Sequence, residues 1–203
     1  MDTVTSTGLP EDSAWASFNT SLSVAALKKF CSDIERLFRI NPMLEFKHWQ
    51  VISKDRIHLH CINSSQEQAI DVDVEMTIVE VEDGFEIMYS NGIKTNTHFK
   101  IEPTEQGSKL TITENYRGLS KSEQQEKLNE VDKSIVIWAN YLQRYLSMWQ
   151  RWSRFAVWRW YIRKVWQPMK PSGRRITYML LWISALEIAL ISLGFAIYYI
   201  EFT

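Results

Sequence analysis

The chain has 203 residues, a net charge of −1 and a hydrophobic fraction of 45%, which leaves room for one domain of ordinary size plus an appendage. Its two isolated cysteines, Cys31 and Cys61, exclude a disulfide framework and predict reduced thiols. Residues 1–13 are polar and hold no apolar stretch that could insert into a membrane, so we expect no secretory signal.

Charge is divided along the chain more sharply than the net value indicates. Residues 1–132 hold 13 Lys/Arg against 22 Asp/Glu, whereas residues 133–186 hold 10 Lys/Arg and no acid. This basic stretch lies next to an apolar segment at 176–200, which only three residues follow. Because basic residues remain on the cytoplasmic side of a membrane span, we expect the N-terminal domain to be cytoplasmic.

The first elements are short. We expect the polar residues 1–14 to form a mobile leader, and residues 15–22 fit a first strand. Two short helices are expected at 23–31 and 32–40, and Asn41-Pro42 ends the second because the residue before proline disfavours helical backbone.

From residue 44 to residue 119 the hydrophobic pattern has a period of two, which is typical of antiparallel strands with one buried face. Turn signals such as Asp83-Gly84 and Asn91-Gly92 separate the apolar runs. We expect six strands here, near 44–52, 55–63, 68–81, 84–90, 94–103 and 107–118.

A long helix is expected to start near Ser122 and to lie against the sheet. Its apolar positions recur at spacings of three and four, as in Ile135, Trp138 and Leu142. The order is therefore strand, two short helices, six strands and one long helix. This order, with the segment 32–42 (SDIERLFRINP), resembles the START-like or SRPBCC superfamily, which includes polyketide cyclases and the birch-pollen-allergen fold.

The resemblance covers residues 15–150 and implies an α+β helix-grip fold, in which a curved antiparallel sheet of about seven strands surrounds a long C-terminal helix and an apolar cavity. It concerns element order and not a catalytic motif, so it informs the fold more than the function. The basic, Trp-rich extension at 151–175 and the apolar segment at 176–200 depart from the family pattern.

Two histidines on one strand, His58 and His60, raise the question of a metal site. If paired positions sum to 131, His60 faces Asp71 and His58 faces Asp73, while Arg56 faces Glu75; we expect these to be ordinary charge pairs on the outer face of the sheet. No metal, no cofactor and no catalytic residue is predicted, since zinc-type spacing, a phosphate loop and a nucleophile elbow are all lacking.

Glu114 is the most interesting polar residue of the expected sheet. Strict alternation sends it inward with Tyr116, where it could bind a ligand's polar end or act as a base. A bulge, or a strand that runs past the cavity rim, would instead turn Glu114 to solvent. The sequence favours this solvent-facing orientation over the inward one. Further candidates to line the cavity are Tyr89, Thr97, His48 and Trp49.

The stretch from 147 to 170 interleaves tryptophans with basic residues, and on one helix neither set collects on a single side. An unbroken helix over 122–167 would be about 66 Å long, so its second half would project from the domain. Contact with lipid at the headgroup level and contact with a membrane protein partner both explain this mixture of tryptophans and basic residues. Binding to nucleic acid is disfavoured. The candidate membrane- or partner-binding residues are Trp149, Trp152, Arg154, Trp158, Arg159, Trp160, Arg163, Trp166, Arg174, Arg175 and Glu187.

The segment 176–200 is long enough to cross a bilayer of roughly 30 Å, with Tyr178, Trp182, Tyr198 and Tyr199 near its ends. Glu187 is the only ionisable residue within it; a carboxyl at that depth is either tolerated in its neutral form or meets a partner helix.

Three functions remain open from the sequence. The first is a non-enzymatic, membrane-tethered START-like module that binds a lipid or another hydrophobic ligand, with its cavity mouth near the bilayer. The second is an accessory or assembly subunit of a larger membrane complex. The third is a cyclase-like enzyme that acts on an apolar substrate. Only Glu114 and nearby tyrosines support this hypothesis.

Overall fold

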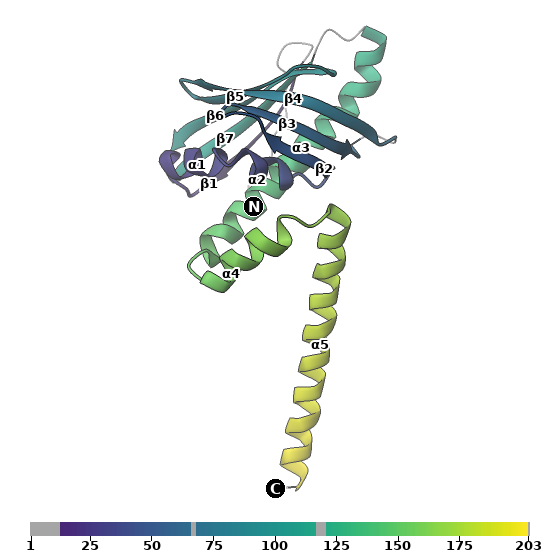
Figure 1. Cartoon of the computed structure of the whole chain (residues 1–203). Helices are drawn as coiled ribbons and strands as arrows, with labels where there is room; N and C mark the ends of the chain where they lie inside the picture. Colours follow the sequence, from purple (N-terminus) through teal and green to yellow (C-terminus); the bar gives the residue numbers. More distant parts are fainter. Residues whose placement is uncertain (1–12, 66–67, 117–120, 203) are drawn as a thin grey trace.

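A computed structural model describes residues 13–65, 68–116 and 121–202 (Figure 1). The polar leader expected at 1–14 falls mostly on residues 1–12, outside the described residues. The described chain contains seven strands close to those that the sequence predicts. They are β1 (Ser13–Thr20), β2 (Leu44–Val51), β3 (Arg56–Asn63), β4 (Ile70–Val81), β5 (Gly84–Tyr89), β6 (Lys94–Thr104) and β7 (Gly107–Tyr116).

The strands form one antiparallel sheet in the order β1-β7-β6-β5-β4-β3-β2. Consecutive strands are neighbours from β2 to β7, and β1 closes the far edge by pairing with β7 over its whole length. Buried and more exposed residues alternate along β3 and β7, so one face of the sheet carries the core. The two short helices before β2 and the long helix after β7 lie beneath the concave face of this curved sheet (Figure 1).

The charge pairs predicted on the outer face are present, although the predicted register is wrong by two residues. His60 lies opposite Asp73 in the strand register, yet its Nε2 contacts the Asp71 carboxylate at 2.9 Å. In the same diagonal manner His58 Nε2 contacts Asp73 at 2.5 Å, and Arg56 contacts Glu75 at 2.6 Å. A shift of two residues leaves every side chain on the same face, which is why alternation could not detect it.

Two short helices, α1 (Val24–Cys31) and α2 (Ile34–Arg39), follow β1. Each begins at a side-chain cap: Ser23 accepts from the Ala26 amide at 3.3 Å, and Asp33 accepts from the Arg36 amide at 3.1 Å. Their buried side chains, among them Leu27 and Leu37, join the core beneath the sheet.

The long helix α3 (Lys121–Trp152) lies in the grip of the sheet, as predicted. Trp138 is 2% exposed, its Nε1 donates to the Leu37 carbonyl at 3.1 Å, and its ring meets Phe38 and Phe99 edge-on. Helix α3 is therefore tied both to the sheet and to α2. The side chains of residues 121–133, which include Ser122 at the expected helix start, lie outside the described part of the chain.

The unbroken helix over 122–167 that the sequence analysis considered does not form. Helix α3 ends at Trp152, and the chain reverses through 153–155 into α4 (Ala156–Tyr161) and the π-helical turn η1 (Ile162–Trp166). Ile162 is 1% exposed and joins the core, so this segment folds back under the domain instead of projecting from it. Tryptophans and basic residues do not collect on one side of a single helix because two short helices with different neighbours form in place of one long helix.

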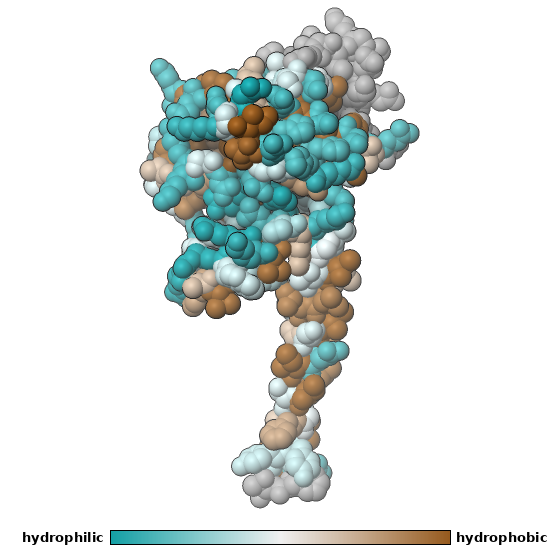
Figure 2. All heavy atoms as spheres, viewed as in Figure 1, coloured by the Kyte–Doolittle hydropathy of each residue, from teal (hydrophilic) through white to brown (hydrophobic). Residues whose placement is uncertain are grey.

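The last helix, α5 (Pro171–Phe202), extends away from the domain (Figure 1). Among the described residues it is the one helix whose length and apolar composition suit a membrane crossing, and none of its apolar window is buried. Its 32 residues correspond to about 48 Å at 1.5 Å per residue. Figure 2 shows apolar side chains on this projecting helix below a largely hydrophilic domain surface.

Two residues of the folded-back segment offer a matched test of its packing. Ile162 is buried, whereas Val157, five residues earlier, is 78% exposed. We expect Ile162→Ala to lower the free energy of unfolding by about 2–4 kcal/mol, because it leaves a cavity in the core. Val157→Ala is expected to change it by less than about 0.5 kcal/mol. Chemical denaturation of the full-length chain measures both values, and equal effects would show that the segment is not docked.

Candidate cavity of the helix grip

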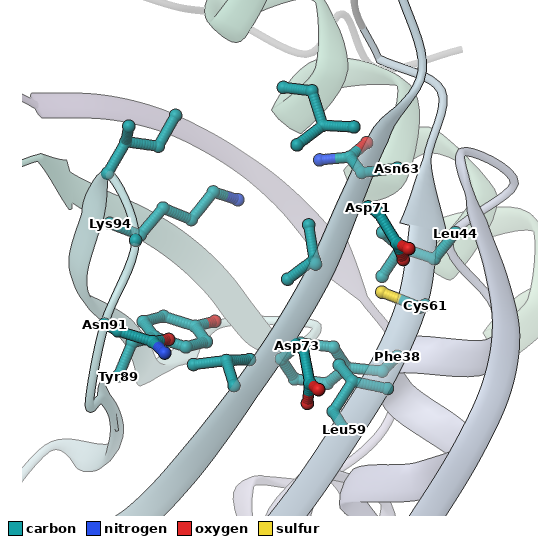
Figure 3. Close-up of a pocket in the computed structure, with 15 residues that line it drawn as sticks. Phe38, Leu44, Leu59, Cys61, Asn63, Asp71, Asp73, Tyr89, Asn91 and Lys94 are labelled. Atoms are coloured by element: carbon teal, nitrogen blue, oxygen red, sulfur yellow. The ribbon is translucent and has the colours of Figure 1, made fainter.

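A cavity of about 400 Å³ lies inside the grip, between the sheet and α2. Its volume lies within the range of small-molecule sites, roughly 300–1,000 Å³. Most of the wall is apolar, and polar side chains stand near the opening (Figure 3). The lining residues are Phe38, Leu44, Leu59, Cys61, Asn63, Ile70, Asp71, Val72, Asp73, Val74, Tyr89, Asn91, Gly92, Ile93 and Lys94.

The mouth of the cavity arises from a mismatch in strand length. Strand β4 has 12 residues but pairs with the shorter β5 only from Met76 onward. Beyond a last bond from the Ser90 amide to the Glu75 carbonyl, the first half of β4 separates from the β5–β6 turn. Figure 3 shows Asp71 and Asp73 on one side of the opening and Asn91 and Lys94 on the other. Gly92 permits this turn, because its φ of +91° is rarely adopted by other residues.

Glu114 faces inward and is only 2% exposed, so the solvent-facing orientation that the sequence favoured is wrong. Lys94 makes a short ion pair with Glu114 Oε1, and the Tyr116 hydroxyl donates to Oε2 at 2.5 Å. A β-bulge between Lys94 and Asn96 brings Lys94 to the inner face, where strict alternation from Thr97 would have turned it outward. The burial of Glu114 is tolerated because it has a cationic partner.

The buried ion pair lies between the cavity and α3. Lys94 lines the main cavity and also a second space of about 30 Å³, the size of roughly one water molecule, which Glu114, Ser134 and Trp138 line as well. Lys94 was not among the residues predicted to line the cavity, and the signal that could have indicated it is its place two residues after the Asn91-Gly92 turn.

Tyr89 and Thr97 form a second polar pair inside the grip. The Tyr89 hydroxyl lies 2.8 Å from Thr97 Oγ1, and burial together with the nearby Glu114 charge raises the pKa of Tyr89. The tyrosine therefore stays neutral and offers a hydroxyl to the cavity that it lines. Thr97 is fully buried and supports Tyr89 from behind without lining the cavity itself.

The two β2 candidates, His48 and Trp49, follow a bulge between Phe46 and His48, which exchanges the faces that they occupy. His48 lies on the outer face, where its ring is 6.0 Å from that of His58, so the prediction that it lines the cavity is wrong. Trp49 lies opposite Leu59 on the inner face, with its ring centre 5.7 Å from that of Phe46, but it packs against the core and does not line the cavity either.

The base of α5 is joined to the domain through Arg174. Its guanidinium donates to the carbonyls of Arg39 (2.5 Å), Gln167 (2.8 Å) and Trp166 (3.1 Å), and it lies 4.2 Å from the centre of the Trp166 ring. Arg39 ends α2 and Trp166 ends η1, so one cation satisfies carbonyls at two helix C-termini. Lys170 adds an ion pair of 2.7 Å to Glu45 at the start of β2.

The residues predicted to bind a membrane or a partner divide into two groups. Trp149, Trp158 and Trp166 are partly buried against the core, and Arg174 is engaged in the joint. The second group is exposed and comprises Trp152, Arg154, Arg159, Trp160, Arg163, Arg175 and Glu187. The sequence alone could not separate the groups, because the reversal after Trp152 decides which residues face outward.

The sequence matches no protein-family model and no curated protein. Solved structures are nevertheless similar in fold. The protein TTHA0849 from Thermus thermophilus has a TM-score of 0.54 at 10% identity, with 67% of this chain and 97% of that chain covered. Ms6760 from Mycobacterium smegmatis has a TM-score of 0.52 at 13% identity, with 72% and 99% covered.

A START superfamily protein from Mycobacterium smegmatis is also similar, with a TM-score of 0.45 at 15% identity and with 64% and 99% covered. The chain has the predicted helix-grip fold, a seven-stranded antiparallel sheet that grips a long helix, and it carries an additional apolar helix, α5.

The buried ion pair predicts an asymmetric response to substitution. The Glu114 side chain is 3% exposed and the Lys94 side chain 29%, so an unpaired carboxylate costs more than an unpaired ammonium. We expect Lys94→Met to destabilise the fold by about 3–5 kcal/mol, Glu114→Gln by less, and the double variant by less than the sum. Unfolding by urea measures the three values; strict additivity would contradict the pairing.

The joint at Arg174 is testable by hydrogen exchange. In Arg174→Gln, the carbonyls of Arg39 and Gln167 lose their donor, so we expect the amides of residues 163–174 to exchange faster while those of β6 and β7 keep their protection. Arg175→Gln is the matched control, because Arg175 is exposed. Identical exchange in the two variants would show that Arg174 does not hold the base of α5.

Proposed function

We propose that this protein is a membrane-tethered START-like module that binds a lipid or another hydrophobic ligand in the cavity of its helix grip. The observation that carries the proposal is the cavity itself, with about 400 Å³ enclosed by mainly apolar side chains and an opening between β4 and the β5–β6 turn. A small molecule of amphiphilic character fits such a site, because an apolar wall supplies affinity and a few polar groups fix orientation.

Polar groups lie on both walls of the cavity, since β4 contributes Asp71 and Asp73. Lys94 and the neutral Tyr89 hydroxyl belong to the β5–β6 wall, opposite apolar residues such as Leu59 and Val72. Because the Lys94 ammonium is already balanced by Glu114, the wall presents hydrogen-bond donors without a large net charge. A ligand with a neutral or weakly anionic polar group and an apolar body matches this arrangement.

The tether in this proposal is α5, which crosses the bilayer as a single span. The residues before the span are basic, from Arg151 to Arg175, and residues 133–186 contain no acid. The proposed orientation therefore places the START-like domain on the cytoplasmic side.

One observation favours a second candidate function, an accessory or assembly subunit of a membrane complex. Glu187 lies exposed in the middle of α5, and among the described residues it has no ion pair. A carboxyl at that depth is stabilised by a polar group of a neighbouring helix. The enzyme hypothesis has less support, because Glu114 is held by Lys94 and Tyr116 and is not free to act as a base.

Filling the cavity tests the proposed ligand site. In full-length protein in nanodiscs that contain a photoactivatable diazirine fatty acid, we expect cross-links in the peptides of β3, β4 and the β5–β6 turn. Val72→Trp is expected to abolish these cross-links, because Val72 faces the cavity, and to leave cross-links to α5 unchanged. Mass spectrometry of the digested protein locates the cross-links.

Val79→Trp is the matched control, since Val79 is exposed on the outer face of the same strand. It should leave the cavity cross-links intact. Cavity cross-links that persist in Val72→Trp, or that are absent from the unmodified protein while α5 is labelled, would contradict ligand binding in the grip.

A further inference from the structure

The turn between α3 and α4 carries an exposed apolar cluster that the ligand-binding cavity does not explain. We name it the α3–α4 corner and define it by Trp152, Phe155, Val157 and Trp160, which are 46%, 44%, 78% and 60% exposed. Four large apolar side chains exposed within nine residues are unusual for a water-facing surface. Figure 2 shows apolar residues at this lower edge of the domain, among hydrophilic neighbours.

Hydrogen bonds and packing fix the conformation of the α3–α4 corner. The Phe155 amide donates to the Trp152 carbonyl at 3.0 Å, and the Arg159 guanidinium donates to the Ser153 carbonyl at 2.6 Å. The rings of Trp152 and Phe155 lie 5.8 Å apart. On its other side the segment is fixed by the buried Ile162. The exposed side chains are therefore held in place before any partner arrives.

The charges around the corner have one sign. Arg151, Arg154, Arg159, Arg163 and Lys164 are exposed in this region, and no acid occurs between residues 133 and 186. A second copy of the same surface would be repelled, whereas an anionic surface would be attracted. Tryptophan and arginine together are the composition that interfacial segments use at lipid headgroups.

The position of the α3–α4 corner indicates which anionic surface it contacts. It lies on the side of the domain from which α5 departs, and in Figure 1 it reaches the level of the first turns of α5. Those turns contain Ile176, Tyr178 and Met179, the residues at which the proposed span would enter the bilayer. The joint formed by Arg174 and Lys170 sets the direction of α5 relative to the domain.

From this geometry we infer that the α3–α4 corner inserts its apolar side chains into the headgroup region of the anionic bilayer that α5 crosses. The inference rests on the proposed tether and adds a second contact, so that the domain lies against the membrane in one orientation instead of swivelling about a single span. The partner is the lipid surface, recognised by apolar insertion and by neutralisation of its negative charge.

Site-specific quenching tests the second contact in the full-length chain. An environment-sensitive fluorophore is attached at Val157→Cys in nanodiscs whose lipids carry bromine in the acyl chains. The native thiols interfere little, since Cys31 and Cys61 are buried and burial raises their pKa values to about 12 and about 11. Lys54→Cys, in the exposed β2–β3 turn, is the matched water-facing control, and Ala189→Cys reports the span.

We expect strong quenching at 157 and 189 and several-fold weaker quenching at 54. Quenching at 189 alone would overturn the second contact and leave the tether standing. Absence of quenching at 189 would contradict the tether and with it the inference. Protection of position 157 from aqueous iodide in native membranes, without quenching by brominated lipid, would assign the corner to a protein partner and also overturn the inference.

A charge-reversal pair tests the role of anionic lipid separately. Raising the anionic fraction of the nanodisc is expected to increase quenching at 157, and Arg151→Glu combined with Lys164→Glu is expected to abolish this increase. Lys28→Glu combined with Lys29→Glu, on the exposed side of α1, makes the same charge change away from the corner and should leave it intact. An equal response of both pairs would show only a general charge effect and contradict the inference.

Discussion

The packing of α3 into the concave face of the sheet is the interaction on which the rest of the molecule depends. Trp138, Leu142 and Leu146 are almost fully buried along this helix, and each such side chain contributes about 1.5–3 kcal/mol by leaving water. The middle of α3, at Ser134 and Trp138, lies near the ion pair of Lys94 and Glu114. The C-terminal end of α3 leads into the reversal from which α4, η1 and finally α5 follow.

A short connection between α2 and β2 serves the cavity and the base of α5 at once. Phe38 and Leu44 line the cavity, while their chain neighbours Arg39 and Glu45 receive Arg174 and Lys170. The cavity and the joint are therefore built on the same stretch of backbone. In the proposed function, this continuity holds the ligand site in a defined place relative to the membrane.

Local pattern predicted the strands and the outward charge pairs, because alternation reports which face a residue occupies. Alternation could not predict the effect of the two β-bulges on side-chain direction. One bulge turned His48 outward and Trp49 inward, and the other brought Lys94 beside Glu114. The burial of Glu114 depends on that second bulge, since a carboxylate is costly to bury alone. The reversal after Trp152 has no proline or glycine to mark it, although the lack of an amphipathic face was a signal that one straight helix was the wrong expectation.

Native mass spectrometry of the full-length chain, extracted from its own membrane in mild detergent, tests the central claim most directly. The account predicts a monomer that carries one small adduct of uniform mass, with an apolar molecule released on unfolding. A chain without adduct that co-purifies stoichiometrically with other membrane polypeptides would contradict it, and would make the protein an accessory subunit whose grip is only a scaffold.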